Sequence, residues 1–162
     1  MPLNPDEIVE AFVVAGRLAG LTLASSDLRT EVLSAPHRRP SSMPAGTQAI
    51  YAFLFGESCL KVGKAGPKTQ ARFTSQHYGA GAPSTLAKSI IKNRDPILRL
   101  VAPHYFRQEI EALTIASVGL WLETNTARFH LFLPATASRS ALTFAEAFIQ
   151  CRLQPVYEGR GS

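Results

Sequence analysis

The sequence predicts an α+β fold, with a small three-stranded antiparallel sheet flanked by helices and an N-terminal helical extension. An aromatic and apolar run at residues 49–55 is followed, after a short Gly-Glu-Ser segment, by a second apolar run at residues 60–63, a pattern typical of a β-hairpin. A later run at residues 127–134 alternates well enough to form a third strand. With 162 residues, the chain has room for one hydrophobic core, so we expect a single domain.

The N-terminal part of the chain predicts a helix and an irregular linker. Residues 5–20 open with Pro-Asp-Glu and carry apolar side chains at helical spacing, which favours a helix. Residues 34–47 are rich in Pro, Ser and Gly and have no periodicity. We therefore interpret residues 1–48 as a helix with a linker and residues 49–162 as the main domain.

Helices are expected around the predicted strands. The pattern favours helices at about 68–77 and 84–93, and one long helix or two over 104–123. A last helix at residues 141–153 would be stopped by Pro155.

Composition excludes several classes of protein. Hydrophobic residues make up 46% and charged residues 18%, which argues for a folded globule over a disordered chain. Two cysteines, Cys59 and Cys151, make no disulfide framework, and no secretory leader is recognisable, so we expect a cytoplasmic protein. The longest strongly apolar run, residues 112–122, is too short to span a bilayer, so no membrane role is expected.

Positive charge is concentrated in the middle of the chain. Residues 49–108 carry nine lysines and arginines against two acids, a net charge of +7, whereas residues 1–48 and 109–162 each carry −1. Such a segment attracts anions and is suited to a phosphate backbone. A solvated cationic face without a ligand is the alternative interpretation.

The predicted hairpin would place Tyr51 and Lys61 on one face. With a three-residue loop, Phe53 opposes Lys61 and Tyr51 opposes Gly63, which has no side chain and would leave space for a substrate beside the phenol. A two-residue loop would send Lys61 to the opposite face. Tyr51 alone would be interpreted as a core residue, but an ammonium in an apolar strand must reach solvent or find an anion.

A second anomaly lies in the last predicted helix, where Glu146 falls within an apolar stripe. A carboxylate facing the core must pair, take up a proton or hold a cation, and a lone carboxylate near a phosphate suits Mg²⁺. The alternative is a salt bridge to Arg72 or Arg152.

Further candidates for phosphate contacts follow the hairpin. The guanidinium of Arg72 can make two parallel bonds to a phosphate. Lys64 and His77 are further candidates, although His77 could equally be a structural ring. Lys68, Lys88 and Lys92 add positive charge on the neighbouring helices.

Together these residues resemble the GIY-YIG nuclease superfamily. That family pairs a G-I-Y strand with a Y-I-G strand, followed by a helix with an arginine and a later helix with a glutamate. Here the elements read Ala49-Ile50-Tyr51, Lys61-Val62-Gly63, Arg72 and Glu146, with Pro155, Tyr157 and Glu158 downstream. The resemblance covers residues 49–77 and about 127–158, and it makes residues 94–126 a helical insertion. Lys61 replaces the second motif tyrosine, and Glu158 stands where asparagine is common.

The resemblance implies a divalent-metal-dependent endonuclease that hydrolyses phosphodiester bonds in single- or double-stranded DNA, with restriction or defence among the roles that fit. Glu146 would hold Mg²⁺ or Mn²⁺, and Tyr51, its proton affinity lowered by Lys61 and the metal, would activate or orient water. Arg72 would stabilise the transition state. Gly63, Lys64, Lys68, His77, Lys88 and Lys92 would bind the nucleic acid.

Two alternatives stay open from the sequence. One is a nucleic-acid-binding module on the same scaffold that has lost catalysis, with Lys61 as a sign of that loss. The other is a protein-interaction domain with an incidental basic face, which predicts no salt-dependent binding to nucleic acid.

Overall fold

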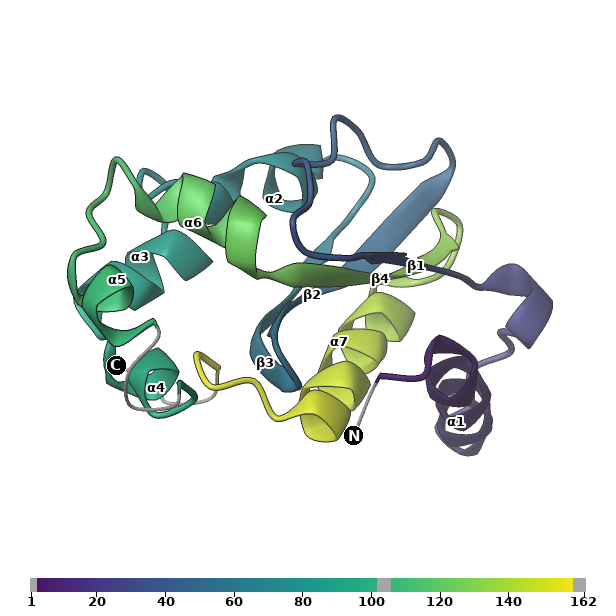
Figure 1. Ribbon diagram of the computed structural model, residues 1–162. Helices are drawn as coiled ribbons and strands as arrows, with labels where there is room; N and C mark the ends of the chain where they lie inside the picture. The colour runs from purple at the N-terminus through teal and green to yellow at the C-terminus, as the bar shows by residue number, and fades with distance from the viewer. Residues whose placement is uncertain (1–2, 102–105, 159–162) are drawn as a thin grey trace.

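The computed structural model describes residues 3–101 and 106–158, which form a four-stranded antiparallel sheet flanked by helices (Figure 1). The strands lie in the order β1-β4-β2-β3. Their bounds are β1 Arg29–Leu33, β2 Thr47–Phe55, β3 Ser58–Ala65 and β4 Ala127–Pro134. The α+β class is as predicted, and β3 forms one edge of the sheet.

The prediction of three strands is wrong by one, because β1 pairs with β4 at the other edge. β1 has five residues, and none of them is fully buried, since only one strand lies beside it. Its sequence, Arg-Thr-Glu-Val-Leu, therefore lacks the apolar alternation that identifies a half-buried strand.

Helices cover both faces of the sheet. The α-helices are α1 Pro5–Leu18, α2 Gln70–Thr74, α3 Leu86–Lys92, α4 Asp95–Leu98, α5 Arg107–Glu111, α6 Val118–Asn125 and α7 Arg139–Leu153. Two 3₁₀ turns, η1 Ser25–Asp27 and η2 Gln76–Tyr78, complete the described elements. In Figure 1, α1 and α7 lie on one side of the sheet, and α2, α3 and α6 lie on the other.

Two hydrophobic clusters follow from this layering. Alternate side chains of β2, among them Ile50 and Ala52, pack with α7 and α1, and the Phe12 ring lies 5.6 Å from that of Phe148. Tyr51 and Phe53 point to the opposite face and join the larger cluster, built with α3 and α6. We call this second side of the sheet the site face.

The β2–β3 hairpin contains a β-bulge that was not anticipated. Phe55 pairs with Ser58 across a two-residue Gly56-Glu57 turn, and the register then shifts between Phe53 and Leu54. Leu60 is the extra residue, and it lies in the same cluster as Phe53. The predicted three-residue loop is therefore wrong, but the bulge restores the predicted pairs Phe53–Lys61 and Tyr51–Gly63.

The other helical predictions hold with shorter elements. The segment predicted at 68–77 is divided into α2 and η2, and the segment at 84–93 is α3. Of the two alternatives predicted for 104–123, one long helix or two, the structure has two, α5 and α6, and the first residues of this segment lie outside the described part of the chain. No helix in residues 3–101 and 106–158 is both long and apolar enough to cross a membrane.

The segment after α7 is fixed to the edge of the sheet. Gln154 adopts a left-handed conformation with φ of 46°, Pro155 follows, and the helix ends there, as predicted. The backbone N–H groups of Val156 and Tyr157 then donate to the carbonyl oxygens of Cys59 and Leu60, each at 3.0 Å. Figure 1 shows this segment, in yellow, running from α7 past β3 toward α4.

Candidate active site

A pocket of about 560 Å³ opens at the exposed edge of β3. It collects side chains from β2, β3, α2, η2, α3, α7 and the segment after α7. Nine of the ten residues proposed from the sequence line it: Tyr51, Lys61, Gly63, Lys64, Arg72, His77, Lys88, Lys92 and Glu146. Lys68 does not line it, because it lies exposed in the turn before α2.

Tyr51 and His77 form a buried hydrogen-bonded pair. The Leu86 backbone N–H, at the start of α3, donates to His77 Nδ1 at 3.1 Å, so the neutral ring carries its proton on Nε2. His77 Nε2 lies 2.7 Å from Tyr51 Oη and therefore donates to the phenol oxygen. Burial, aided by the positive charges of Lys61, Arg128 and Arg72, lowers the pKa of His77 to about 3, which keeps this ring neutral.

This geometry changes the expected role of His77. Both of its ring nitrogens already have partners, and its side chain is buried, so it has no free nitrogen for a phosphate. His77 therefore holds the Tyr51 phenol in place, which is the structural interpretation left open for this ring.

The protonation of Tyr51 also differs from the expectation. Burial raises the pKa of Tyr51, whereas the positive charges of Arg72 and Arg128 partly oppose this effect. The lower proton affinity that we expected Lys61 to give the phenol is not found, because the effect of burial outweighs that of the nearby positive charges. The phenol is protonated at neutral pH in this structure.

Gly63 does not leave an empty space beside the phenol, as the sequence suggested. The Tyr51 ring itself lies across this glycine, and a Cβ added to Gly63 would come within 2.6 Å of Tyr51 Oη. Gly63 therefore permits the close approach of the ring to the backbone of β3.

Lys61 is buried and paired with a carboxylate that sequence reasoning noted only as a departure from the family pattern. Its Nζ lies 2.9 Å from a carboxylate oxygen of Glu158. The backbone bonds of Val156 and Tyr157 to the bulge place Glu158 there. The ammonium in the apolar strand has thus found an anion within the chain.

Glu146 faces the pocket from α7 and pairs with Lys64. The Lys64 Nζ lies 2.7 Å from Glu146 Oε2 and also donates to Thr143 Oγ1 at 3.2 Å. The alternative salt bridges proposed for Glu146 are not present, because Arg152 pairs with Glu7 instead and Arg72 makes no ion pair within the described residues. The Glu146 side chain keeps 22% of its surface exposed.

The wall formed by α2 and α3 is cationic and unpaired. Arg72, Lys88 and Lys92 are exposed, line the pocket, and make no side-chain ion pair or hydrogen bond to any residue that the structure describes. The pocket therefore has two lysine–glutamate pairs on the β3 side and three available cations on the other. This arrangement attracts an anion with several charged oxygens.

Arg128 is a structural residue of the site that sequence reasoning missed. It is fully buried on β4, donates to the Phe73 carbonyl oxygen at 2.8 Å and to Tyr78 Oη at 3.0 Å, and lies 5.5 Å from the Tyr51 ring centroid. It thereby connects α2 and η2, which carry Arg72 and His77, to the sheet. A charged residue inside an otherwise apolar strand was the available signal, as it was for Lys61.

The donor set of the pocket is compatible with one hard divalent cation. The described residues contain no group of three or more His, Cys, Asp or Glu side chains suited to a metal. Mg²⁺ usually keeps several waters and binds through one or two carboxylates together with substrate phosphates. Glu146, partly exposed in the pocket, offers one carboxylate of this kind, and Glu158 is a second carboxylate in the same pocket.

Comparison of the chain with protein-family models, with curated proteins and with solved structures found no match.

Proposed function

We propose that this protein is a divalent-metal-dependent endonuclease that hydrolyses phosphodiester bonds in DNA, with a GIY-YIG-like arrangement of its active site. The observation that carries the proposal is the convergence of Tyr51, Arg72 and Glu146 in one pocket, although they come from β2, α2 and α7. The three unpaired cations beside them supply the charge that a phosphate backbone requires.

Tyr51 is the residue that would orient or deprotonate the attacking water. The N–H of His77 donates to its oxygen and stabilises negative charge there. His77 cannot take the phenol proton, because its Nε2 is protonated and its Nδ1 accepts from Leu86. The phenol proton must therefore go to solvent before Tyr51 can take a proton from the attacking water.

Arg72 and Lys61 would stabilise charge on the phosphoryl group. Arg72 is exposed on the pocket wall with all its donors available. Lys61, although paired with Glu158, lies on the same face of the sheet as Tyr51. A cation at this position compensates the negative charge that grows in the transition state.

Glu146 is the residue that would hold the metal, and its Lys64 partner would then be free for a phosphate oxygen. A bound Mg²⁺ or Mn²⁺ would withdraw charge from the phosphoryl oxygens and stabilise the leaving oxygen.

Nicking of supercoiled plasmid DNA with Mg²⁺ or Mn²⁺ tests this function. Wild-type protein should nick the plasmid, and Glu146→Gln should lower the rate by at least about 10²-fold, as expected when a group that acts on the transition state is removed. Glu10→Gln, which removes an exposed acid of α1, is the matched control and should keep wild-type activity.

Two outcomes would reject the proposal. Equal rates for wild type and Glu146→Gln would remove the role given to Glu146. Salt-dependent DNA binding by a wild-type protein that nicks nothing with either metal would favour the catalytically inactive binding module.

A further inference from the structure

A second cavity of about 570 Å³ adjoins the candidate active site. The two cavities share Ser89, Lys92, Tyr157 and Glu158 in their linings, so they are neighbouring parts of one groove. The second cavity extends from this shared border toward α4, where Pro96, Arg99 and Leu100 belong to the segment that we interpreted as an insertion.

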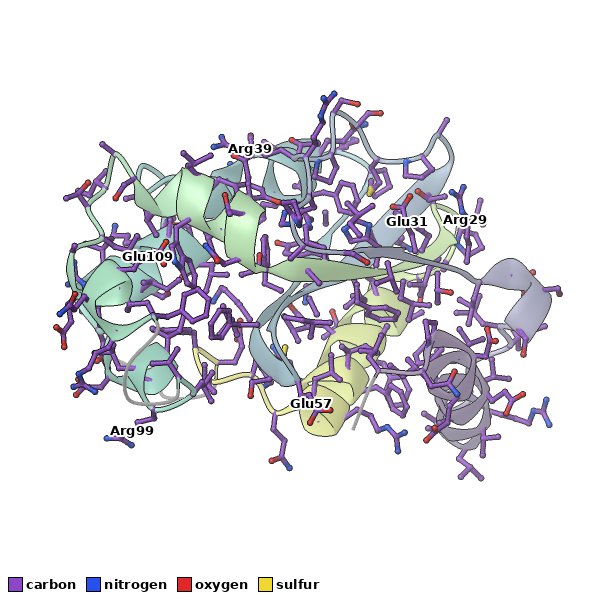
Figure 2. All side chains as sticks on the ribbon, in the orientation of Figure 1. Arg29, Glu31, Arg39, Glu57, Arg99 and Glu109 are labelled. Carbon is purple, nitrogen blue, oxygen red and sulfur yellow. The ribbon has the colours of Figure 1, made fainter. Side chains whose placement is uncertain are left out.

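The lining of the second cavity combines an apolar surface with two cations. Pro96, Leu100, Pro155 and Val156 supply the apolar part. Lys92 and Arg99 supply positive charge, and neither makes a side-chain ion pair or hydrogen bond in residues 3–101 and 106–158. Figure 2 shows Arg99 extending away from the ribbon near α4.

Tyr157 forms a fixed part of this border. Its hydroxyl donates to the Asn93 carbonyl oxygen at 3.0 Å, and its backbone N–H donates to the Leu60 carbonyl oxygen at 3.0 Å. The ring therefore has a defined position between the two cavities, which lowers the entropy cost of packing a flat ligand against it.

We infer that the second cavity binds an unpaired nucleotide next to the scissile phosphate. This inference rests on the proposed function. The base would pack on the apolar surface and on Tyr157, while Lys92 and Arg99 would contact the phosphates that flank it. A nucleotide needs both an apolar contact for its base and a cationic contact for its phosphate, and this cavity offers both. Because the cavity adjoins the candidate active site, one DNA strand could occupy both.

The shape of the groove selects an unpaired base over a stacked one. Bases in a duplex present only their edges, and their faces are covered by neighbouring bases. A base reaches a recessed apolar surface only after it has left the stack, which costs a few kcal/mol in a duplex and much less in a single strand or a mismatch. The groove thus predicts a preference for DNA that is unpaired beside the cleavage position.

Binding in EDTA measures this preference separately from hydrolysis. Measured by fluorescence anisotropy, wild-type protein should bind a single-stranded oligonucleotide at least about tenfold more tightly than the duplex of the same sequence. When the bases are replaced one at a time by an abasic site, the affinity should fall about tenfold at one or two adjacent positions. This is the effect expected from the loss of one base–aromatic contact. A deoxynucleoside monophosphate should bind more weakly than the oligonucleotide.

Arg99→Gln tests the cationic part of the cavity, with Arg17→Gln as a control of equal charge change on α1. Both arginines are exposed, so neither substitution is expected to unfold the protein. Arg99→Gln should weaken binding of the single strand about five- to tenfold, the size of one lost phosphate contact, and Arg17→Gln should leave it unchanged.

The outcomes separate this inference from the function on which it rests. Equal affinity for single strand and duplex, a flat abasic scan, monophosphate binding as tight as that of the oligonucleotide, or equal effects of Arg99→Gln and Arg17→Gln would each overturn the nucleotide site. Each of these results can occur in a protein that nicks plasmid normally. Loss of the proposed nuclease function would instead appear as absent nicking with an intact abasic-scan pattern.

Discussion

Gly63 determines where the Tyr51 ring can lie. The ring rests on the backbone of β3, and a Cβ at residue 63 would lie 2.6 Å from the phenol oxygen, closer than two non-bonded atoms approach. We expect Gly63→Ala to move the ring and to lower the nicking rate about 10²-fold, the usual cost of misplacing a reacting group by about 1 Å. Plasmid nicking with Mg²⁺ measures the effect.

Gly66→Ala is the matched control for this change. A Cβ at Gly66 would meet only Thr69 Oγ1, at 3.8 Å, which is an ordinary contact. This variant should keep wild-type activity. Similar rates for the two alanine variants would contradict the importance of the ring position.

The raised pKa of Tyr51 predicts a pH dependence of the rate. Since the phenol is protonated at neutral pH, the reactive phenolate fraction grows about tenfold for each unit of pH between 7 and 9. The nicking rate should rise with that slope. Tyr51→Phe should lose most of the activity, and its residual rate should not follow the slope. An unchanged slope in Tyr51→Phe would assign the titration to another group.

The lowered pKa of His77 predicts acid sensitivity of the fold. His77 stays neutral in the native protein down to about pH 3, whereas the unfolded chain binds its proton near 6.5. The unfolded state therefore binds more protons in this window, and the free energy of unfolding falls by about 1.4 kcal/mol per unit as pH decreases. Urea unfolding at several pH values should show a shallower dependence for His77→Gln than for wild type. Parallel curves would contradict this assignment.

At the residue scale, the sequence identified which residues gather but not how each is used. Lys61 and Glu146 could be singled out because a charge in an apolar pattern needs a partner. Which partner each takes depends on segments distant in the chain, since Glu158 reaches Lys61 only through the bonds of Val156 and Tyr157 to the bulge. The neutral state of His77 likewise depends on the Leu86 N–H, which no local pattern predicts.

At the scale of elements, β3 and the segment after α7 stabilise one another through the Lys61–Glu158 pair. A double-mutant cycle with Lys61→Met and Glu158→Gln should give a coupling free energy of about 1–3 kcal/mol, because the ammonium is buried. Chemical denaturation measures each variant.

The exposed pair Arg107–Glu111 on α5 is the control for that cycle. Its side chains are each about half exposed, so its coupling should be no more than about 0.5 kcal/mol. Equal coupling in the two pairs would mean that Glu158 does not hold Lys61 in solution.

The elements that were predicted well are those with strong patterns. β2 and β4 are buried on both faces, and α7 has a serine cap at Ser138 and a stop at Pro155. β1 was missed because an edge strand has little to bury, and the break between α5 and α6 was left open because no Gly or Pro marks it. The hairpin strands β2 and β3 were thus predictable, whereas the edge strand β1 and the helices of residues 94–126 depend on tertiary contacts.

At the scale of the whole molecule, three unpaired cations, Arg72, Lys88 and Lys92, gather on one wall of the pocket, while residues 1–48 and 109–162 are each close to neutral. DNA binding should therefore weaken strongly with salt. Neutralising three phosphates corresponds to a slope of about −2.1 to −2.7 in log K against log salt, or roughly 20- to 40-fold between 50 and 200 mM.

Lys88→Gln should reduce the magnitude of this slope by about one, whereas Arg139→Gln, on the outer side of α7, should leave it unchanged. Anisotropy titrations at several salt concentrations measure both. A slope near zero in the wild-type protein would favour a protein-interaction domain.

The bulge at Leu60 has a consequence for how this hairpin can tolerate changes in length. Because Leu60 is the extra residue, removing it would leave Phe53 opposite Lys61 and Tyr51 opposite Gly63, and every later residue of β3 would keep its side. Removing Val62, which lies beyond the bulge, would instead bring Lys64 opposite Tyr51, and the phenol would lose the glycine on which it rests. Deletion of Val62 should consequently inactivate the protein, whereas deletion of Leu60 should keep the register of the hairpin.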